Sequence, residues 1–350
     1  MPDAEVIRID SRSRADADDS PRTKCKATTT SGRPCKNYAV GDSGYCRIHQ
    51  DRSSLSQHPS ARQRPRVAEA EEPQDSWGKI TEFLRRRLAG EYRIDDFGYD
   101  RELSRAVLLP LARPLYENYF RVRTLGVTRI PSEGSPALLV GNHSGTVALD
   151  ALMMQYAVAT EHPDERTIRN IGADLVFRLP FIGPLARKTG TAMACDEDAH
   201  ELLRRGELVG VFPEGYKGVG KGWRDRYKLQ RFGRGGFIEI ALRAGVPIVP
   251  VAIVGAEEAY PMIGNASALA RAFGFPYFPI TPTFPLLGPL GLIPLPSRWV
   301  IEFGEPIPLD DYPDDAADDK MLVFDLADSI RDTIQQMLYK NLKFRGGTFF

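Results

Sequence analysis

Three uninterrupted apolar runs, separated by stretches with helical spacing, constrain the fold of this 350-residue chain more than any other feature. The apolar runs are residues 137–140, 208–212 and 247–254, and helical patterns occupy residues 149–158 and 237–244. A strand in which every residue is apolar needs cover on both faces, which is typical of sheets with helices on either side. The sequence therefore predicts an α/β domain with a mixed, largely buried sheet flanked by helices, with a further strand at 299–303 and a closing helix over 320–342.

Outside this region the composition changes along the chain. Residues 1–24 and 51–75 are rich in charged residues, serine and proline and have hardly any large apolar side chains, so we expect both segments to be disordered. Over residues 76–122 apolar residues recur at helical spacing beside basic ones, which predicts amphipathic helices. These helices either pack on the core or lie on an anionic lipid surface. The main domain then occupies residues 123–350.

Three cysteines and a histidine gather between the two segments that we expect to be disordered, over residues 25–50. Cys25, Cys35, Cys46 and His49 supply the four ligands of a closed tetrahedral zinc site. So short a segment has no core to fold around without a metal. We therefore expect a small Cys3His module with a structural zinc ion, whose partner is unknown; the alternative is that the cysteines are free thiols. The remaining Cys195 stands alone in the main domain and is expected to be structural.

The first residues of the chain are polar and lack the apolar segment of a secretory signal, which predicts a cytoplasmic protein. The longest uncharged run, residues 272–297, is long enough to cross a bilayer but contains seven prolines, which oppose a continuous helix. We expect no membrane span there. The run either shapes an apolar binding site, rests at a lipid interface, or forms a buried loop over the sheet.

A histidine and an aspartate follow the first apolar run. A neutral imidazole is the usual base for removing a proton from a hydroxyl near neutral pH, and a carboxylate on its other nitrogen fixes the tautomer. The spacing of His143 and Asp150 allows one to follow the strand and the other to lie in the first turn of the next helix. They are candidates for a general base and its orienting partner, although a single histidine after a strand is more often structural.

A second motif, formed by Phe212, Pro213, Glu214 and Gly215, follows the next apolar run. The proline ends strand pairing, the glycine permits a tight turn, and the acid is held at the edge of the sheet. Both motifs then lie past strand ends, where open α/β sheets bind their ligands. Residues 217–234 add a glycine-rich basic loop, which either binds a phosphate group or is merely solvated.

Asn142-His143 with its following aspartate, then Phe-Pro-Glu-Gly, then the strand 246–251 resemble, in that order, the glycerolipid acyltransferases of the lysophosphatidic acid acyltransferase (PlsC-like) superfamily. The resemblance covers roughly residues 120–310. It implies a PlsC-like acyltransferase fold for residues 123–350. It also implies transfer of a fatty acyl group from acyl-CoA, or from acyl carrier protein, to the hydroxyl of a glycerolipid or lysophospholipid.

In that reading His143 is the general base, Asp150 orients it, Glu214 with Gly215 helps to bind the acceptor, and no covalent acyl-enzyme forms. The residues expected to contact substrate are Asn142, Ser144, Gly145, Phe212, Pro213, Glu214, Gly215, Lys217 and Arg234. The partners implied are a lipid acceptor, an acyl thioester donor and the inner face of the membrane, where the protein is expected to be peripheral.

Two departures from the family's pattern concern the acceptor. Six residues separate His143 from Asp150 where the family commonly has four, and this longer step is similar to a branch nearer the diacylglycerol acyltransferase-like members. Residues 190–196, before Phe-Pro-Glu-Gly, lack the arginine that usually binds the acceptor's phosphate. An acceptor without a phosphate is favoured, unless Arg187, Lys188 or the basic loop replaces that arginine.

Two other classes of function stay open. One is a non-enzymatic lipid-binding or membrane-recruitment protein on the same fold, because a fold alone does not establish activity. The other, less favoured, is nucleic-acid binding by the basic residues within 21–66. A phosphate-loop nucleotide hydrolase does not fit, because the glycine-lysine frame at 215–221 continues with Gly222 and not with a hydroxyl. A serine hydrolase does not fit either, because no Gly-x-Ser-x-Gly occurs.

Overall fold

The computed structural model describes residues 74–144, 147, 149–313 and 315–349, together with Lys24 and Lys26; the side chains of residues 74–80 are not included. The chain divides into two units, and the described residues belong almost entirely to the second, Gln74–Phe350. The predicted zinc ligands Cys25, Cys35, Cys46 and His49 lie outside the described residues. The zinc module and the disorder predicted for residues 1–24 and 51–73 therefore stay predictions.

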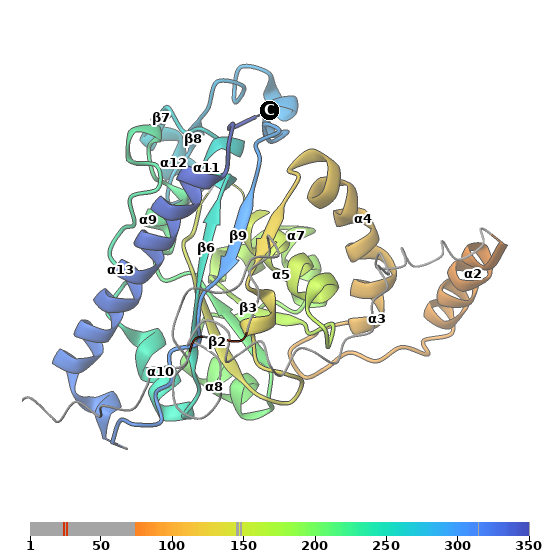
Figure 1. Ribbon diagram of the computed structural model, residues 1–350. Coiled ribbons are helices and arrows are strands. Elements are labelled where there is room, and N and C mark those ends of the chain that lie inside the picture. Colours follow the sequence, from red (N-terminus) through yellow and green to blue (C-terminus); the bar gives the residue numbers. More distant parts are fainter. Residues whose placement is uncertain are drawn as a thin grey trace, which may run out of the picture. The chain divides into compact units, whose positions relative to one another are not determined.

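A seven-stranded sheet forms the centre of the described unit (Figure 1). Its strands lie in the order β1-β9-β6-β2-β5-β3-β4. Neighbouring strands are parallel except β6 and β9, which are antiparallel, so the sheet is mixed as the sequence predicts. In chain order the strands are β1 (Arg123–Leu125), β2 (Ala137–Gly141), β3 (Ile168–Gly172), β4 (Ala192–Met193), β5 (Leu208–Val211), β6 (Ile248–Val254) and β9 (Val300–Phe303).

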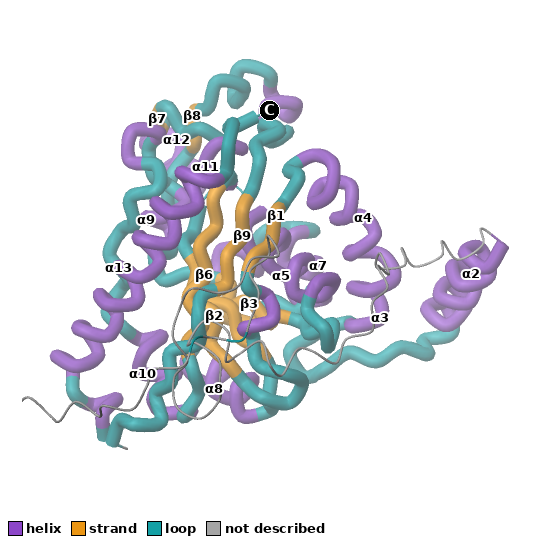
Figure 2. The backbone as a smooth tube through the Cα atoms, viewed as in Figure 1, coloured by secondary structure: helices purple, strands orange, loops and turns teal. Residues whose placement is uncertain are grey.

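Helices lie on both sides of this sheet (Figure 2). The first, α2 (Gln74–Leu88), begins slightly before the predicted residue 76. The predicted helical run up to residue 119 consists of α3 (Arg101–Leu103), α4 (Leu109–Pro114) and two π-helical turns. The others are α5 (Leu149–Glu161), α6 (Asp174–Arg178), α7 (Ile182–Lys188), α8 (Asp196–Arg204), α9 (Tyr216–Val219), α10 (Gly236–Ala244), α11 (Ala256–Ala259), α12 (Ser267–Phe273) and α13 (Lys320–Phe344).

Each face of the sheet has its own apolar core. Successive side chains of a strand point to opposite faces, so Leu139 of β2 packs with Met153 of α5, whereas Leu138 packs with Ile238 of α10 and Leu338 of α13. All five side chains are completely buried. Because both faces are covered, the central strands β2, β5 and β6 carry apolar side chains on both faces and appear in the sequence as continuous apolar runs.

The closing helix α13 is confirmed and ends at Phe344, slightly beyond the predicted 342. Asp319 caps it, because its side chain accepts the backbone N–H groups of Met321 and Leu322. Its buried residues recur every three to four positions along one face: Val323, Ala327, Ile330, Ile334, Leu338 and Asn341. This stripe packs on one face of the sheet and accounts for the helical periodicity of the sequence.

Between β6 and β9 the chain leaves the sheet over residues 260–297, which we call the apolar excursion. It contains α12, the small two-stranded sheet of β7 (Gly264–Asn265) and β8 (Pro279–Ile280), and a 3-10 turn at Gly288–Leu292. The uncharged run 272–297 lies within it and forms no long helix. None of the helices in the described part of the chain combines the length and the apolar character that a membrane span requires.

Candidate active site

The end of β2 is fastened to β6 by one buried side chain. Asn142 follows β2 directly, donates through Nδ2 to the Ile253 carbonyl at 3.0 Å, and accepts the Ile253 N–H at 2.7 Å. The side-chain amide thus pairs as a backbone peptide group would, continuing the contact between the strands beyond the last residue of β2. This contact fixes the direction in which the chain leaves the sheet toward His143.

His143 and Asp150 form a hydrogen-bonded pair above the end of β2. His143 Nδ1 lies 2.7 Å from Asp150 Oδ2. Asp150 lies in the first turn of α5, is completely buried, and also accepts the N–H groups of Ser144 and Ala151, each at 2.8 Å. The imidazole stacks on Phe212 with ring centroids 4.7 Å apart, and 17% of its side chain is exposed. Because Nδ1 is bonded to the carboxylate, Nε2 is the nitrogen left for a substrate.

Opposing effects act on the pKa of His143. Burial lowers it, but the charge and the hydrogen bond of Asp150, helped by the charge of Glu214, outweigh burial, so the pKa of His143 is raised above its ordinary value. A raised pKa makes the neutral imidazole a stronger base. It also raises the pH below which that base is lost to protonation.

Glu214, the acid of the second motif, holds the turn that carries His143. Its side chain is buried, Oε1 accepts the backbone N–H of His143 at 3.1 Å, and Oε2 accepts the N–H of Gln230 at 2.8 Å. The carboxylate therefore joins the ends of β2 and β5 to the loop before α10. Gly215 follows with a φ of +54°, a conformation that favours glycine, and is exposed.

A buried lysine that the sequence analysis did not single out completes this cluster. Lys221 is 3% exposed and places Nζ 3.3 Å from Glu214 Oε2 and 3.1 Å from Glu257 Oε1. Burial raises the pKa of Glu257 to about 7 despite the charge of Lys221. No sequence signal separates Lys221 from the other cations of the basic loop, because only its burial distinguishes it.

The structure brings together most of the predicted substrate residues, but not all of them. The cluster contains Asn142, His143, Ser144, Asp150, Phe212, Pro213 and Glu214. The hydroxyl of Ser144 is buried and has no hydrogen-bond partner among the described residues. Lys217 and Arg234 are exposed and form no ion pair within the described part of the chain. Gly145 lies outside the described residues.

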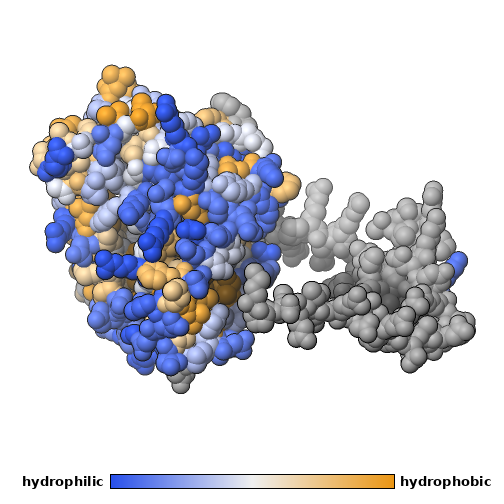
Figure 3. Space-filling view, turned by 90° about the vertical axis from the view of Figure 1, so that its left-hand side faces the viewer, coloured by the Kyte–Doolittle hydropathy of each residue, from blue (hydrophilic) through white to orange (hydrophobic). Residues whose placement is uncertain are grey.

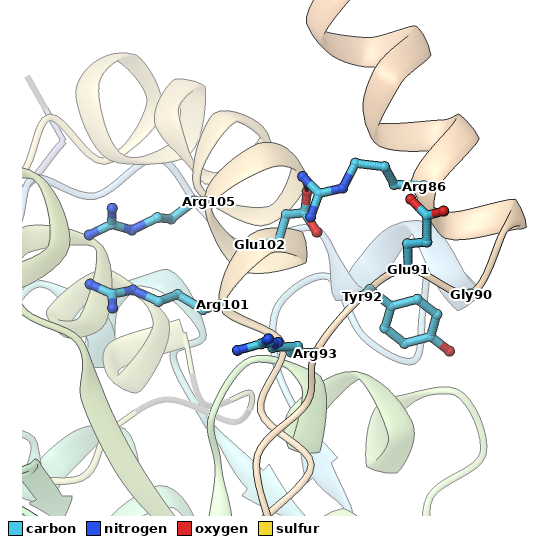
Figure 4. Close-up of a pocket in the computed structure, with 8 residues that line it drawn as sticks. All are labelled: Arg86, Gly90, Glu91, Tyr92, Arg93, Arg101, Glu102 and Arg105. Carbon is cyan, nitrogen blue, oxygen red and sulfur yellow. Dashed lines mark ion pairs between the residues drawn. The ribbon is translucent and has the colours of Figure 1, made fainter.

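A separate cavity of about 690 Å3 lies at the N-terminal helices and includes none of these residues (Figure 4). Its lining residues are Arg86, Gly90, Glu91, Tyr92, Arg93, Arg101, Glu102 and Arg105. Arg86 pairs with Glu102 at 3.1 Å, and Arg105 with Glu165 at 3.5 Å. Since all four arginines are exposed, water screens their charges, and the cavity offers no desolvated cation to an anion.

Comparison with known proteins places the cluster in a recognised domain. Residues 121–254 match the family model described as "Acyltransferase". An uncharacterized protein of Mycobacterium tuberculosis is 55% identical over 271 residues, which are 77% of this chain and 75% of that protein. The "DGAT1/2-independent enzyme synthesizing storage lipids" of Bos taurus is 25% identical over 224 residues, which are 63% of this chain and 60% of that enzyme.

Among solved structures, the 1-acyl-sn-glycerophosphate (LPA) acyltransferase PlsC of Thermotoga maritima aligns with a TM-score of 0.46 and 19% identity. The alignment covers 78% of this chain and 90% of that one. The family match is the more informative of these findings, because residues 121–254 contain His143, Asp150, Glu214 and Lys221.

Proposed function

This chain belongs to the acyltransferase superfamily, and on that premise we propose that it moves a fatty acyl group from acyl-CoA, or from acyl carrier protein, to the hydroxyl of a glycerolipid or lysophospholipid. One observation carries the proposal: a completely buried Asp150 carboxylate lies 2.7 Å from Nδ1 of a partly exposed His143. This is the arrangement by which a carboxylate holds an imidazole in the tautomer that accepts a proton at Nε2.

The reaction proceeds by direct transfer. His143 Nε2 removes the proton of the acceptor hydroxyl as its oxygen attacks the thioester carbonyl carbon. The new carbon–oxygen ester bond forms and the carbon–sulfur bond breaks, and the thiolate leaves with a proton returned from the imidazolium. Asp150 stabilises the imidazolium between these steps, and no acyl group is attached to the protein. Glu214 and Lys221 keep the His143 turn in place.

Among these acceptors we favour one without a phosphate, a neutral glyceride. Residues 190–196 contain no arginine, and Arg187, Lys188 and Lys217 are exposed. The buried Lys221 of the basic loop is already paired with two carboxylates. Exposed cations bind a phosphate weakly because water screens them. The name of the Bos taurus relative refers to storage lipids, which supports a mono- or diacylglycerol acceptor.

We place the enzyme at the inner face of the membrane as a peripheral protein. A glycerolipid acceptor with long acyl chains resides in a bilayer, so the enzyme has to reach it there. In the described part of the chain the helices do not span a membrane. Contact with the bilayer therefore falls to a surface of the folded domain or to the amphipathic N-terminal helices.

The test is thiol release from acyl-CoA and acyl carrier protein donors in the presence of monoacylglycerol, diacylglycerol, lysophospholipid or glycerol phosphate. We expect acceptor-dependent release with a neutral glyceride, and a loss of about 100-fold or more in His143→Ala because general-base catalysis supplies that much. The matched control is His200→Ala, since His200 is exposed on α8.

Full acceptor-dependent release by a folded His143→Ala protein would remove His143 from the chemistry. Absence of release from every donor and acceptor, in protein shown to be folded, would favour a non-enzymatic lipid-binding or recruitment protein on the same fold.

A further inference from the structure

The apolar excursion, residues 260–297, exposes large apolar side chains that no part of the described chain covers. Leu286 is 83% exposed, Leu290 is 68% exposed and Phe273 is 63% exposed, and Ile263 and Ile293 are also exposed. Figure 3 shows apolar surface at the top of the molecule, the end at which Figure 1 places β7, β8 and α12. Contiguous apolar patches on soluble domains mark contact with another apolar surface.

The polar groups near the tip of this segment bond to one another. The Thr281 hydroxyl accepts the N–H groups of Thr283 and Phe284, and the Thr283 hydroxyl donates to the Gly291 carbonyl at 3.1 Å. The backbone N–H of Leu287 donates to the Thr283 carbonyl, and that of Gly288 to the Pro285 carbonyl. The seven prolines between residues 272 and 297 have no N–H group that needs a partner. The tip of the excursion can therefore enter an apolar layer without leaving these donors unpaired.

Charge favours an anionic partner. No Asp or Glu occurs between Glu258 and Glu302, so no carboxylate has to be buried when the excursion is covered. The basic loop adjoins it, because the Trp223 N–H donates to the Met262 carbonyl at 2.8 Å. Next to Trp223, Arg224 and Arg226 are exposed. An apolar surface with cations along its border matches the combination of acyl chains and anionic head groups at a bilayer surface.

The excursion is also continuous with the candidate active site. Gly218 of α9 is in close contact with the His143 carbonyl, and the neighbouring Gly220 packs against the ring of Tyr277. Tyr277 belongs to the excursion, and the charge of Asp150 helps burial to raise the pKa of its hydroxyl to about 12. α9 and Tyr277 thus connect the excursion to the turn that carries His143.

We propose that the apolar excursion is the surface by which this protein inserts into an anionic phospholipid bilayer, so that an acceptor lipid reaches His143 without passing through water. This inference rests on the proposed function only for the identity of the acceptor. The insertion itself follows from the exposed apolar side chains, the internally bonded polar groups of the tip and the absence of carboxylates in residues 260–297.

The test is co-sedimentation of the full chain with vesicles of pure phosphatidylcholine and of phosphatidylcholine with phosphatidylglycerol. The combined variant Leu286→Ser, Leu287→Ser, Leu290→Ser should lower the partition coefficient on both vesicles by about tenfold or more, because three large apolar side chains no longer enter the bilayer. Met321→Ser with Tyr339→Ser is the matched control, since both residues are exposed and apolar but lie on α13, and it should bind as the wild type does.

His143→Ala separates the two proposals. This variant should partition like the wild type while losing acyl transfer. If the unmutated protein binds the vesicles but transfers no acyl group, only the proposed function is contradicted. Unchanged partitioning of the triple serine variant on both vesicles, in protein with an unaltered unfolding midpoint, would overturn the inference. An equal loss of binding in the α13 control would overturn it too, because the excursion would then have no special part in the contact.

Discussion

At the scale of single residues, the behaviour of His143 depends on the charges that touch one imidazole. Burial alone would weaken it as a base, whereas Asp150 and Glu214 supply negative charge that raises its pKa above the ordinary value. The base works only when neutral, so transfer should decline as the pH falls through this raised pKa. The acid limb of the pH–rate profile should therefore lie above the ordinary histidine pKa.

Replacing Asp150 by asparagine tests this account. Asp150→Asn removes the charge that raises the pKa of His143, so the acid limb should move to lower pH, and transfer should slow by about 100-fold because the tautomer is no longer held. The measurement is kcat/KM for acyl transfer from about pH 5 to about pH 9. The control is Asp225→Asn, an exposed carboxylate of the basic loop. An acid limb that does not move would show that Asp150 does not set the pKa.

The sequence predicts a site residue where a chemically reactive residue type directly follows a recognisable strand. His143 with Asp150 met that condition, and the structure places them within hydrogen-bond distance; their catalytic role stays a prediction. Lys221 and Glu257 did not meet it. Lys221 lies among glycines and other cations, and its burial depends on Glu257, which comes from a distant helix and which no local pattern connects to it.

At the scale of elements, the short helix α9 packs so closely on the His143 turn that position 218 has room only for glycine. A Cβ atom at Gly218 would lie 2.7 Å from the His143 carbonyl oxygen and 2.8 Å from Glu214 Cβ. Neither neighbour can give way easily, because one is backbone and the other is held by the hydrogen bonds of Glu214. The position of α9 thereby controls the position of the base.

Gly218→Ala should therefore reduce acyl transfer. Overpacking of this kind costs about 1–3 kcal/mol, and displacement of the His143 turn should lower kcat by roughly tenfold or more. Gly222→Ala is a matched control, because a Cβ at Gly222 meets nothing within 4 Å and its φ is not positive. Steady-state kinetics on the two variants decide the matter, and equal kcat values would show that α9 does not position the base.

The elements that the sequence predicted are those with one clear periodicity. β2, β5 and β6 are continuous apolar runs, β9 is apolar except for Glu302, and α13 has a regular helical stripe; all five are present. β3 was missed because its sequence contains Arg169 and Asn170, which mask an apolar pattern. Arg169 is nevertheless buried, since it pairs with Asp95 at 2.7 Å and donates to the Gly190 carbonyl at 3.0 Å. A strand with a buried arginine is stable only because residues distant in the sequence supply its ion pair and hydrogen bond.

At the scale of the whole described unit, a buried ion pair joins the end of α13 to α11, which directly follows β6. Arg345, just after α13, places Nη2 2.9 Å from Glu258 Oε1 of α11, and both side chains are almost completely buried. Glu258 also accepts the hydroxyl of Tyr227, which follows the basic loop's Arg226. The pair therefore holds α13, α11 and the basic loop together.

Breaking this pair should destabilise the protein strongly. Arg345→Met leaves Glu258 buried without its partner, which costs about 3–5 kcal/mol. Arg243→Met removes an exposed pair with Asp318 and should cost no more than about 1 kcal/mol. Urea unfolding of both variants at neutral pH gives the two free energies of unfolding. Similar values for both would mean that the buried pair contributes no more than a surface one.

The connection between β6 and β9 has an evolutionary consequence. These strands are antiparallel neighbours, and Val254, the last residue of β6, pairs with Val300, the first of β9. The excursion is therefore a very long hairpin loop whose two ends are already held together by the sheet, and the entropy of closing a loop increases only slowly with its length. Insertions and deletions within it should therefore cost little stability as the sequence evolves, while the sheet and the catalytic pair keep their places.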